Sequence, residues 1–217
     1  MRKQRIVGIS FEHIHMGDLL REAHEHPNAE IVGICDPDGA RMADAIKTFA
    51  ISSDRVFHDI ERCVLETKPD LAILCPATAR HADCVEAVAP LGVDILLEKP
   101  FAASLADADR ILAAVGKAGV RLAVNWPLRW YPAHVTAKRM IDEGAIGETR
   151  VQPEIHDLPV DVLEAPFRKP VEYVLQCREK GVAFEGPLDP AVCRTAQRIV
   201  DTAALSARER RTLPLLL

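Results

Sequence analysis

The stretch Arg5–Asp38, RIVGISFEHIHMGDLLREAHEHPNAEIVGICDPD, decides the fold class of this chain. Its first part, Arg5–Ser10, is a short apolar and β-branched run, which predicts a buried strand. A turn and a helix over Gly17–His26 follow, and a second apolar run, Ile31–Cys35, ends on Asp36. Strand, turn, helix, strand and acid in this order are typical of a βαβ unit that binds a dinucleotide. In such a unit the pyrophosphate lies at the helix N-terminus and the acid holds the adenosine ribose.

The glycine pattern of such a unit is incomplete here. A G-x-G-x-x-G count that starts at Gly8 reaches Ser10 and His13, so only the first glycine is present. Serine is small enough to let the backbone approach a phosphate, but histidine does not allow close packing of helix on strand, so we expect a wider or re-routed turn. Two interpretations stay open: a nucleotide site, or a structural βαβ unit with a polar turn.

The composition is that of an ordinary globular protein. The 217 residues are 48% hydrophobic and 27% charged, enough for one full core and part of a second. A net charge of −5 and scattered basic residues argue against a nucleic-acid surface. No apolar run reaches the roughly 18 residues of a membrane span. The first residues enter a strand without the apolar core of a signal peptide, which predicts a cytoplasmic protein.

The cysteines and histidines do not form a recognisable ligand set. The six cysteines include no C-x-x-C pair and lie mostly in apolar segments, which favours buried, reduced thiols over metal or redox roles. They are Cys35, Cys63, Cys75, Cys84, Cys177 and Cys193. The eight histidines show no H-E-x-x-H or similar pattern, so the sequence predicts no bound metal.

The rest of the first half continues the alternation of strands and helices. Further strands are expected over 55–57, 71–75, 93–97 and 120–124, with helices over 38–50, 59–67, up to Leu91, and from Ser104 to Ala118. This rhythm predicts an α/β fold, a Rossmann-type doubly wound parallel sheet over residues 1–124. Such sheets place their sites at the carboxyl ends of the strands. The polar residues of this chain fall there: Ser10, Asp36, 76–81, 98–100 and Asn125.

The motifs at these strand ends carry a resemblance. Cys-Pro-Ala-Thr-x-x-His (75–81), Glu-Lys-Pro (98–100) and Asn-Trp-Pro-Leu-Arg-Trp-Tyr-Pro (125–132) follow the fourth, fifth and sixth strands. With the βαβ opening, they resemble the Gfo/Idh/MocA family of NAD(P)-dependent oxidoreductases, relatives of glucose–fructose oxidoreductase and inositol dehydrogenase. Glu-Lys-Pro in this register is the most specific part. The resemblance covers residues 3–150 and the closing helices within 168–217.

One difference from the family is large. Its members carry an open, mostly antiparallel sheet between the Rossmann part and the closing helices, which binds substrate and shapes the dimer. Here Gly147–Gln152 resembles the first strand of that sheet, but the closing helices follow within about 20 residues, too few for five or six strands. Residues 125–217 are therefore expected to hold a connecting helix near 132–143, a truncated or missing α+β domain and the C-terminal helices. A deletion or an omitted segment near 150–167 would explain the gap. The family's aspartate and histidine pair has no matching positions, since His156 and Asp157 are adjacent.

Ten residues are candidates for binding the cofactor. They are Gly8, Ser10, Phe11, His13, Asp36, Pro76, Ala77, His81, Glu98 and Asn125. Asp36 would bind both ribose hydroxyls, and because Asp38 adds a second acid and no arginine directly follows, NAD is expected rather than NADP. Alternatively, Asp36 is a turn or helix-start acid, and His81 is a helix-start histidine bonded to a loop carbonyl.

Lys99 is the predicted catalytic residue. At the carboxyl edge of the sheet its ammonium could lie over the nicotinamide and the substrate hydroxyl, polarise the carbon–oxygen bond or join a proton relay. The alternative is a surface lysine paired with Glu98. The candidate substrate contacts are Lys99, Arg129 and Trp126, although tryptophans more often pack a domain junction.

The sequence therefore predicts an NAD-dependent dehydrogenase that acts on a CH–OH group of a sugar, cyclitol or related polyol. Its expected partners are this small-molecule substrate and further copies of itself in a homo-oligomer, with no nucleic acid or membrane. The alternative is a non-catalytic nucleotide-binding or scaffold protein that has lost its substrate domain. The altered glycine turn and the missing sheet favour this alternative. Because the chain retains the cofactor half and little of the substrate half, we expect cofactor binding even if turnover is lost.

Overall fold

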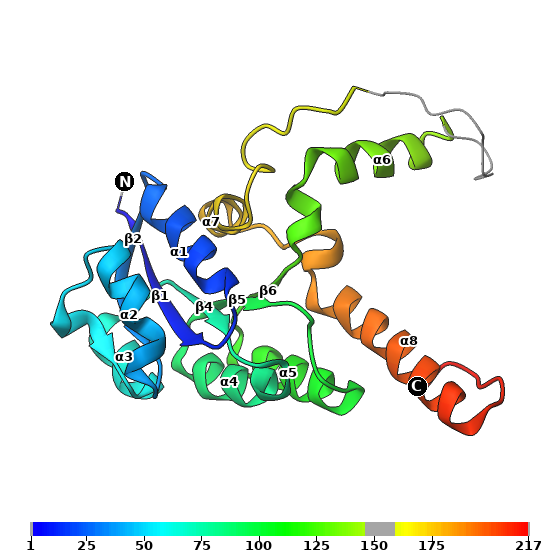
Figure 1. The fold of residues 1–217 in the computed structure, drawn as a ribbon, viewed down its shortest axis with the longest axis horizontal. Coiled ribbons are helices and arrows are strands. Elements are labelled where there is room, and N and C mark those ends of the chain that lie inside the picture. Colours follow the sequence, from blue (N-terminus) through cyan, green and yellow to red (C-terminus); the bar gives the residue numbers. More distant parts are fainter. Residues whose placement is uncertain (1, 146–158, 217) are drawn as a thin grey trace.

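The predicted Rossmann-type sheet is confirmed in the computed structural model, which describes residues 2–145 and 159–216 (Figure 1). Six parallel strands lie in the order β3-β2-β1-β4-β5-β6. Their bounds are β1 Gln4–Phe11, β2 Ala29–Cys35, β3 Val56–Phe57, β4 Leu71–Cys75, β5 Asp94–Glu98 and β6 Leu122–Asn125. The order reverses between β1 and β4, so a crevice opens at their carboxyl ends, where doubly wound sheets bind ligands.

Helices cover both faces of this sheet (Figure 1). They are α1 His15–Glu25, α2 Gly39–Thr48, α3 Ile60–Thr67, α4 His81–Val88 and α5 Leu105–Ala118. Strand residues alternate between two apolar cores: Val7 faces the core under α3, α4 and α5, whereas Ile6 faces the core under α1 and α2. This alternation is the two-residue period of a strand that is buried on both sides.

Side chains that begin two of the helices are those expected from the sequence. The Asp59 carboxylate accepts the Arg62 N–H at 2.7 Å at the start of α3. The Ser104 hydroxyl accepts the Asp107 N–H at 3.1 Å at the start of α5. Each cap satisfies a donor that would otherwise lack a partner in the first helical turn.

The six cysteines are all buried and unpaired, as their apolar surroundings predict. Burial raises the pKa of the Cys84 thiol to about 12 and that of the Cys75 thiol well above its usual value. These thiols therefore stay protonated and unreactive near neutral pH.

Two arms extend from the sheet domain (Figure 1). One is α6, Pro132–Asp142, which confirms the connecting helix, and the other is α8, Pro190–Glu209. Helix α7, Pro170–Lys180, lies against α1, and short 3₁₀ segments are η1 Ser53–Arg55, η2 Thr78–Arg80, η3 Ala89–Leu91, η4 Pro127–Trp130 and η5 Gly186–Leu188. The expected strand over 147–152 and the pair His156–Asp157 lie outside the described residues.

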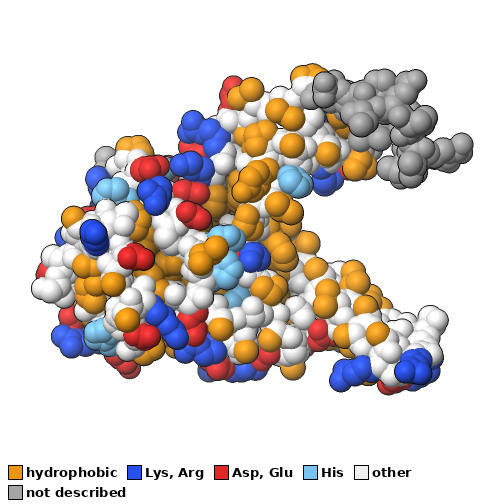
Figure 2. All heavy atoms as spheres, in the orientation of Figure 1, with side chains coloured by type: hydrophobic (Ala, Val, Ile, Leu, Met, Phe, Trp, Pro, Cys, Tyr) orange, Lys and Arg blue, Asp and Glu red, His pale blue; other side chains and the backbone are white. Residues whose placement is uncertain are grey.

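Figure 2 shows a hollow between the two arms, with many apolar side chains along it. Large apolar side chains are exposed on α6, on α8 and on neighbouring segments of the chain: Leu128, Tyr131, Ile141, Val162, Ile199 and Val200. Within the described residues, no helix is both long enough and apolar enough to cross a membrane.

Glu22 joins α1 to α7 and should make the stability of the chain depend on pH. Its carboxylate accepts the Val171 N–H at 3.2 Å, and burial raises its pKa from 4.5 to about 7. The folded state therefore holds this proton more tightly than the unfolded state does. The free energy of unfolding should fall as pH rises from about 4.5 to 7.

Glu22→Gln should remove this slope, since the amide keeps an acceptor for Val171 but does not ionise. At pH 8 the variant should be more stable than the wild type by about 1–3 kcal/mol, and at pH 4 the two should be nearly equal. Urea unfolding at both pH values measures the difference. An equal loss of stability at both pH values would show that burial does not raise the pKa of the Glu22 carboxyl group.

Candidate functional site

Three polar side chains meet where β5 and β6 end. Glu98 and Asn125 are paired in the register of these neighbouring strands. Glu98 is fully buried, and its Oε2 accepts the Asn125 Nδ2–H at 3.0 Å. Its other oxygen, Oε1, lies 3.5 Å from the Lys99 Nζ. The structure therefore brings together three of the predicted site residues at the carboxyl edge of the sheet.

Two histidines join this group, His13 from the turn between β1 and α1 and His15 from the first position of α1. His13 Nε2 lies 3.2 Å from Lys99 Nζ, and His15 Nδ1 lies 3.0 Å from Glu98 Oε1. Burial lowers the pKa of His13, and the neighbouring Lys99 lowers it further, although Glu98 acts in the opposite direction. A neutral His13 can accept a hydrogen bond at Nε2 from the Lys99 ammonium. The sequence placed His15 with His13 beside the phosphate turn but did not pair it with Glu98, because 83 residues separate the two.

The turn itself is re-routed, as the missing glycines predict. Strand β1 continues to Phe11, and its register with β4 shifts between Ile9 and Phe11. Ser10, between them, has a φ of 63°, a conformation that glycine adopts more easily. Close packing of helix on strand occurs instead at Gly8, where an added Cβ would lie 3.0 Å from the Met16 sulfur. Gly8 thus faces α1 rather than the crevice.

Glu12 is a site residue that the sequence analysis did not consider. Its carboxylate accepts the Ala77 N–H at 2.8 Å, is hydrogen-bonded to the Arg80 guanidinium and lies 3.1 Å from Arg41. Burial alone would raise the pKa of Glu12, but the Ala77 N–H and the Arg80 guanidinium outweigh it and hold the pKa below its usual value. One acid and two cations therefore occupy the mouth of the crevice.

Asp36 is fully buried and bonded to the backbone on both oxygens. It accepts the Phe11 N–H at 2.6 Å and the Asp38 N–H at 2.8 Å. These contacts match the alternative interpretation of Asp36 as an acid that shapes the turn. A ribose could reach the Asp36 carboxylate only after the carboxylate is uncovered. The Arg41 guanidinium lies 3.8 Å from it. An arginine is thus close to Asp36 although none directly follows it, which corrects the argument for NAD over NADP.

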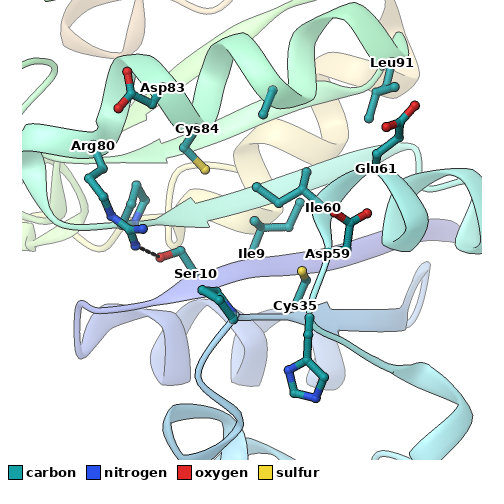
Figure 3. A pocket seen from close by; sticks show the side chains of 14 residues that line it. Ile9, Ser10, Cys35, Asp59, Ile60, Glu61, Arg80, Asp83, Cys84 and Leu91 are labelled. Carbon is teal, nitrogen blue, oxygen red and sulfur yellow. Dashed lines mark hydrogen bonds between the residues drawn. The ribbon is translucent and has the colours of Figure 1, made fainter.

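A cavity of about 640 Å³ opens beside the carboxyl ends of β1 and β2, between α3 and α4 (Figure 3). Ser10, Pro37, His58 and Pro76 line it with apolar residues from the two helices. In Figure 3 the Arg80 side chain points to Ser10, with which it forms a hydrogen bond of 3.3 Å. The volume is within the range of small-molecule sites in proteins, about 300–1,000 Å³.

Three predicted site residues lie elsewhere. Both ring nitrogens of the buried His81 lie near backbone carbonyls, those of Phe101 at 3.3 Å and Pro76 at 3.2 Å, which matches its structural interpretation. The Trp126 indole N–H donates to the Cys193 thiol at 3.4 Å and so packs α8 against the sheet domain. Arg129 lines a separate cavity of about 290 Å³ near α6. None of these three therefore joins Lys99.

Comparison with known proteins places this site in context. Residues 5–126 match the family GFO_IDH_MocA, described as an oxidoreductase family with an NAD-binding Rossmann fold. A D-apiose dehydrogenase from Paraburkholderia graminis is 37% identical over 119 residues, which are 55% of this chain and 31% of that protein. An inositol 2-dehydrogenase from Salmonella typhimurium is 29% identical over 147 residues, 67% of this chain and 43% of that protein.

Two solved structures extend the comparison. An oxidoreductase from Agrobacterium radiobacter in complex with NAD+, L-tartaric acid and magnesium is 25% identical with a TM-score of 0.60, over 67% of this chain and 42% of that one. The WlbA dehydrogenase from Bordetella pertussis in complex with NADH and UDP-GlcNAcA is 26% identical with a TM-score of 0.60, over 67% of this chain and 41% of that one. The chain thus spans less than half the length of these relatives.

Proposed function

This chain belongs to the Gfo/Idh/MocA family of oxidoreductases. We therefore propose that it acts as an NAD(P)-dependent dehydrogenase that oxidises a CH–OH group of a sugar, cyclitol or related polyol. The observation that carries the proposal is the position of Lys99 Nζ, 3.2 Å from His13 and 3.5 Å from Glu98 at the carboxyl edge of the sheet. The relatives named D-apiose dehydrogenase and inositol 2-dehydrogenase support a substrate of this class, and they favour the enzyme over the scaffold alternative.

The residues at the crevice fit a dinucleotide once the Glu12 carboxylate moves aside. A backbone N–H and two guanidinium groups converge on Glu12, and these are donors of the kind that hold phosphates. We assign Arg41, Arg80 and the Ala77 amide to the phosphates. The cavity beside Pro37 and His58 would take the adenosine. The proposal includes both NAD and NADP, because Arg41 could pair with the additional phosphate of NADP.

Lys99, His13, Glu98 and Asn125 would position the substrate beside the nicotinamide and move its proton. The nicotinamide, when bound, supplies the hydride acceptor. Lys99 Nζ would hydrogen-bond the substrate hydroxyl. As Lys99 passes one proton to His13 Nε2, 3.2 Å away, its amine would take the proton of the hydroxyl. Glu98 keeps Lys99 at the edge of the sheet, and Asn125 orients Glu98 through its side-chain amide.

Titration with NADH, followed by its fluorescence, tests the proposal, and oxidation of a panel of polyols with NAD and NADP tests turnover. We expect saturable binding and reduction of one of the two cofactors by at least one polyol. Absence of binding at millimolar NADH and NADPH would remove the cofactor site. Binding without turnover of any polyol would leave a nucleotide-binding protein and contradict the enzyme.

Arg80 and Glu12 should affect cofactor binding in opposite directions. Arg80→Met removes a guanidinium from the phosphates and should weaken NADH binding by about 10-fold, or ~1.4 kcal/mol. Glu12→Gln removes the competing charge and should tighten binding. The matched control is Arg62→Met on α3, whose guanidinium pairs with Glu66 at the surface, and it should change nothing. Weaker binding in Glu12→Gln would show that this carboxylate does not occupy the phosphate position.

A homo-oligomer is also part of the proposal. The exposed apolar side chains of the arms support it, because large exposed apolar patches often mark surfaces that a partner covers. Light scattering should give a mass of at least twice that of the single chain. A monomer at micromolar concentration would contradict this part of the proposal without affecting the cofactor site.

A further inference from the structure

We propose that His13, His15 and Glu98 form a binding site for a divalent transition metal ion, with zinc as the ion that they match best. One donor atom from each residue lies within 4.8 Å of the other two. Two imidazoles and one carboxylate, with a further position left for water, are the ligands of one common class of catalytic zinc site. This inference rests on the geometry of the three ligands and not on the proposed dehydrogenase activity, although the metal site shares His13 and Glu98 with the proposed catalytic site.

The donor atoms are already near the separations that a metal requires. Bonds of about 2.0–2.2 Å to nitrogen and oxygen place neighbouring ligand atoms roughly 3.0–3.5 Å apart. His15 Nδ1 and Glu98 Oε1 are 3.0 Å apart. The rings of His13 and His15 are 4.5 Å apart between centroids and at an interplanar angle of 64°. A rotation of the partly exposed His13 side chain would close the remaining gap.

A cation already occupies the space between these ligands. Lys99 Nζ lies 3.2 Å from His13 Nε2 and 3.5 Å from Glu98 Oε1, so the lone pairs of two proposed ligands converge on one positive group. The Lys99 side chain is partly exposed, with 32% of its area accessible, and can withdraw to solvent. The metal ion and the Lys99 ammonium would therefore compete for the same position.

Asn125 provides a second, separate observation. Its Nδ2–H donates to Glu98 Oε2, which fixes the carboxylate and leaves Oε1 for the ion. Hydrogen bonds to ligand side chains orient them in this way in metal sites. Its Oδ1 is buried and has no hydrogen-bond partner among the residues that the structure describes. Asn125 and His15 both line a cavity of about 340 Å³. A water molecule on the ion could donate to this unpaired oxygen, which explains why a buried acceptor is left open here.

The sequence predicted no metal because none of its histidines shows the spacing of a helical ligand pair. The proposed ligands instead come from a turn, as His-x-His, and from the end of a strand far along the chain. Only the path of the β1–α1 turn brings them together.

Calorimetric titration of the metal-free chain with zinc chloride tests the site, and cobalt(II) absorption identifies the ligands. We expect one ion per chain, and a cobalt spectrum without the charge-transfer bands of thiolate ligands. His13→Gln and His15→Gln should each weaken binding by at least 10-fold. Lys99→Met should tighten it, because the competing ammonium is gone. Circular dichroism and thermal unfolding show that each variant is folded.

His24→Gln is the matched control, since His24 lies on the same helix as His15 but its ring packs against Phe49, away from the cluster. It should bind zinc like the wild type. Absence of saturable 1:1 binding at millimolar zinc would overturn the proposal. Unchanged binding in the folded His13→Gln, His15→Gln double variant would also overturn it, as would a thiolate spectrum with cobalt. None of these three results bears on NADH binding, which is measured separately, so failure of the metal site and failure of the proposed function are distinguishable.

Discussion

Replacing Lys99 with alanine should lower kcat for oxidation of the polyol substrate by about 100- to 10,000-fold, the range of a lost general acid or base. The ammonium is the group at the sheet edge that contacts both His13 and Glu98. Its removal takes away the proton path from the substrate hydroxyl. NADH binding should change only a few-fold, because the proposed phosphate contacts come from Arg41 and Arg80.

Steady-state kinetics with the polyol found in the panel, together with the NADH titration, separates the two effects. Lys117→Ala, on the exposed surface of α5, is the matched control and should keep full activity. Lys99→Arg keeps a positive charge but does not release a proton near neutral pH, so it should restore little of the lost kcat. A kcat for Lys99→Ala within 3-fold of the wild type (~0.65 kcal/mol) would contradict the catalytic role.

Replacing Asp36 with alanine should lower the free energy of unfolding by about 3–5 kcal/mol. The carboxylate is fully buried and accepts two backbone N–H groups, those of Phe11 and Asp38. Without it, two donors lose their partner, and each buried donor left unsatisfied costs about 1–3 kcal/mol. The Phe11 contact also closes the β1–α1 turn, so this turn should loosen.

Urea unfolding measures this change. Asp36→Asn keeps one acceptor oxygen and should lose less stability than Asp36→Ala. Asp38→Ala is a control, because it removes the cap of α2, worth about 1 kcal/mol, and an exposed ion pair with Arg41 at 3.6 Å, but leaves Asp36 in place. A loss below 1 kcal/mol for Asp36→Ala would contradict the structural role. NADH binding by Asp36→Ala should be compared with that of the wild type at temperatures where the variant is fully folded. Only then does weaker binding report a lost ribose contact rather than unfolding.

The sequence by itself determined the architecture of the first half of the chain. Apolar runs such as Leu71–Cys75 and helix starts such as Asp59 and Ser104 are local patterns, because strand and helix periods depend on neighbouring residues. The rule that parallel strands place their sites at their carboxyl ends then located Glu98, Lys99 and Asn125. The pairing of β5 with β6 sets Glu98 beside Asn125, so these contacts were within reach of sequence reasoning.

Only the tertiary structure decided what surrounds those residues. The turn after β1 takes its path from the φ of Ser10 and the shifted register with β4, and this path carries His15 to Glu98 and His13 to Lys99. Arg80 reaches Glu12 from η2 and Arg41 reaches it from the first turn of α2, and Asp36 is sealed by Phe11. The physical reason is the range of the interactions: periodicity is local along the chain, whereas ion pairs and buried hydrogen bonds depend on how distant loops pack together.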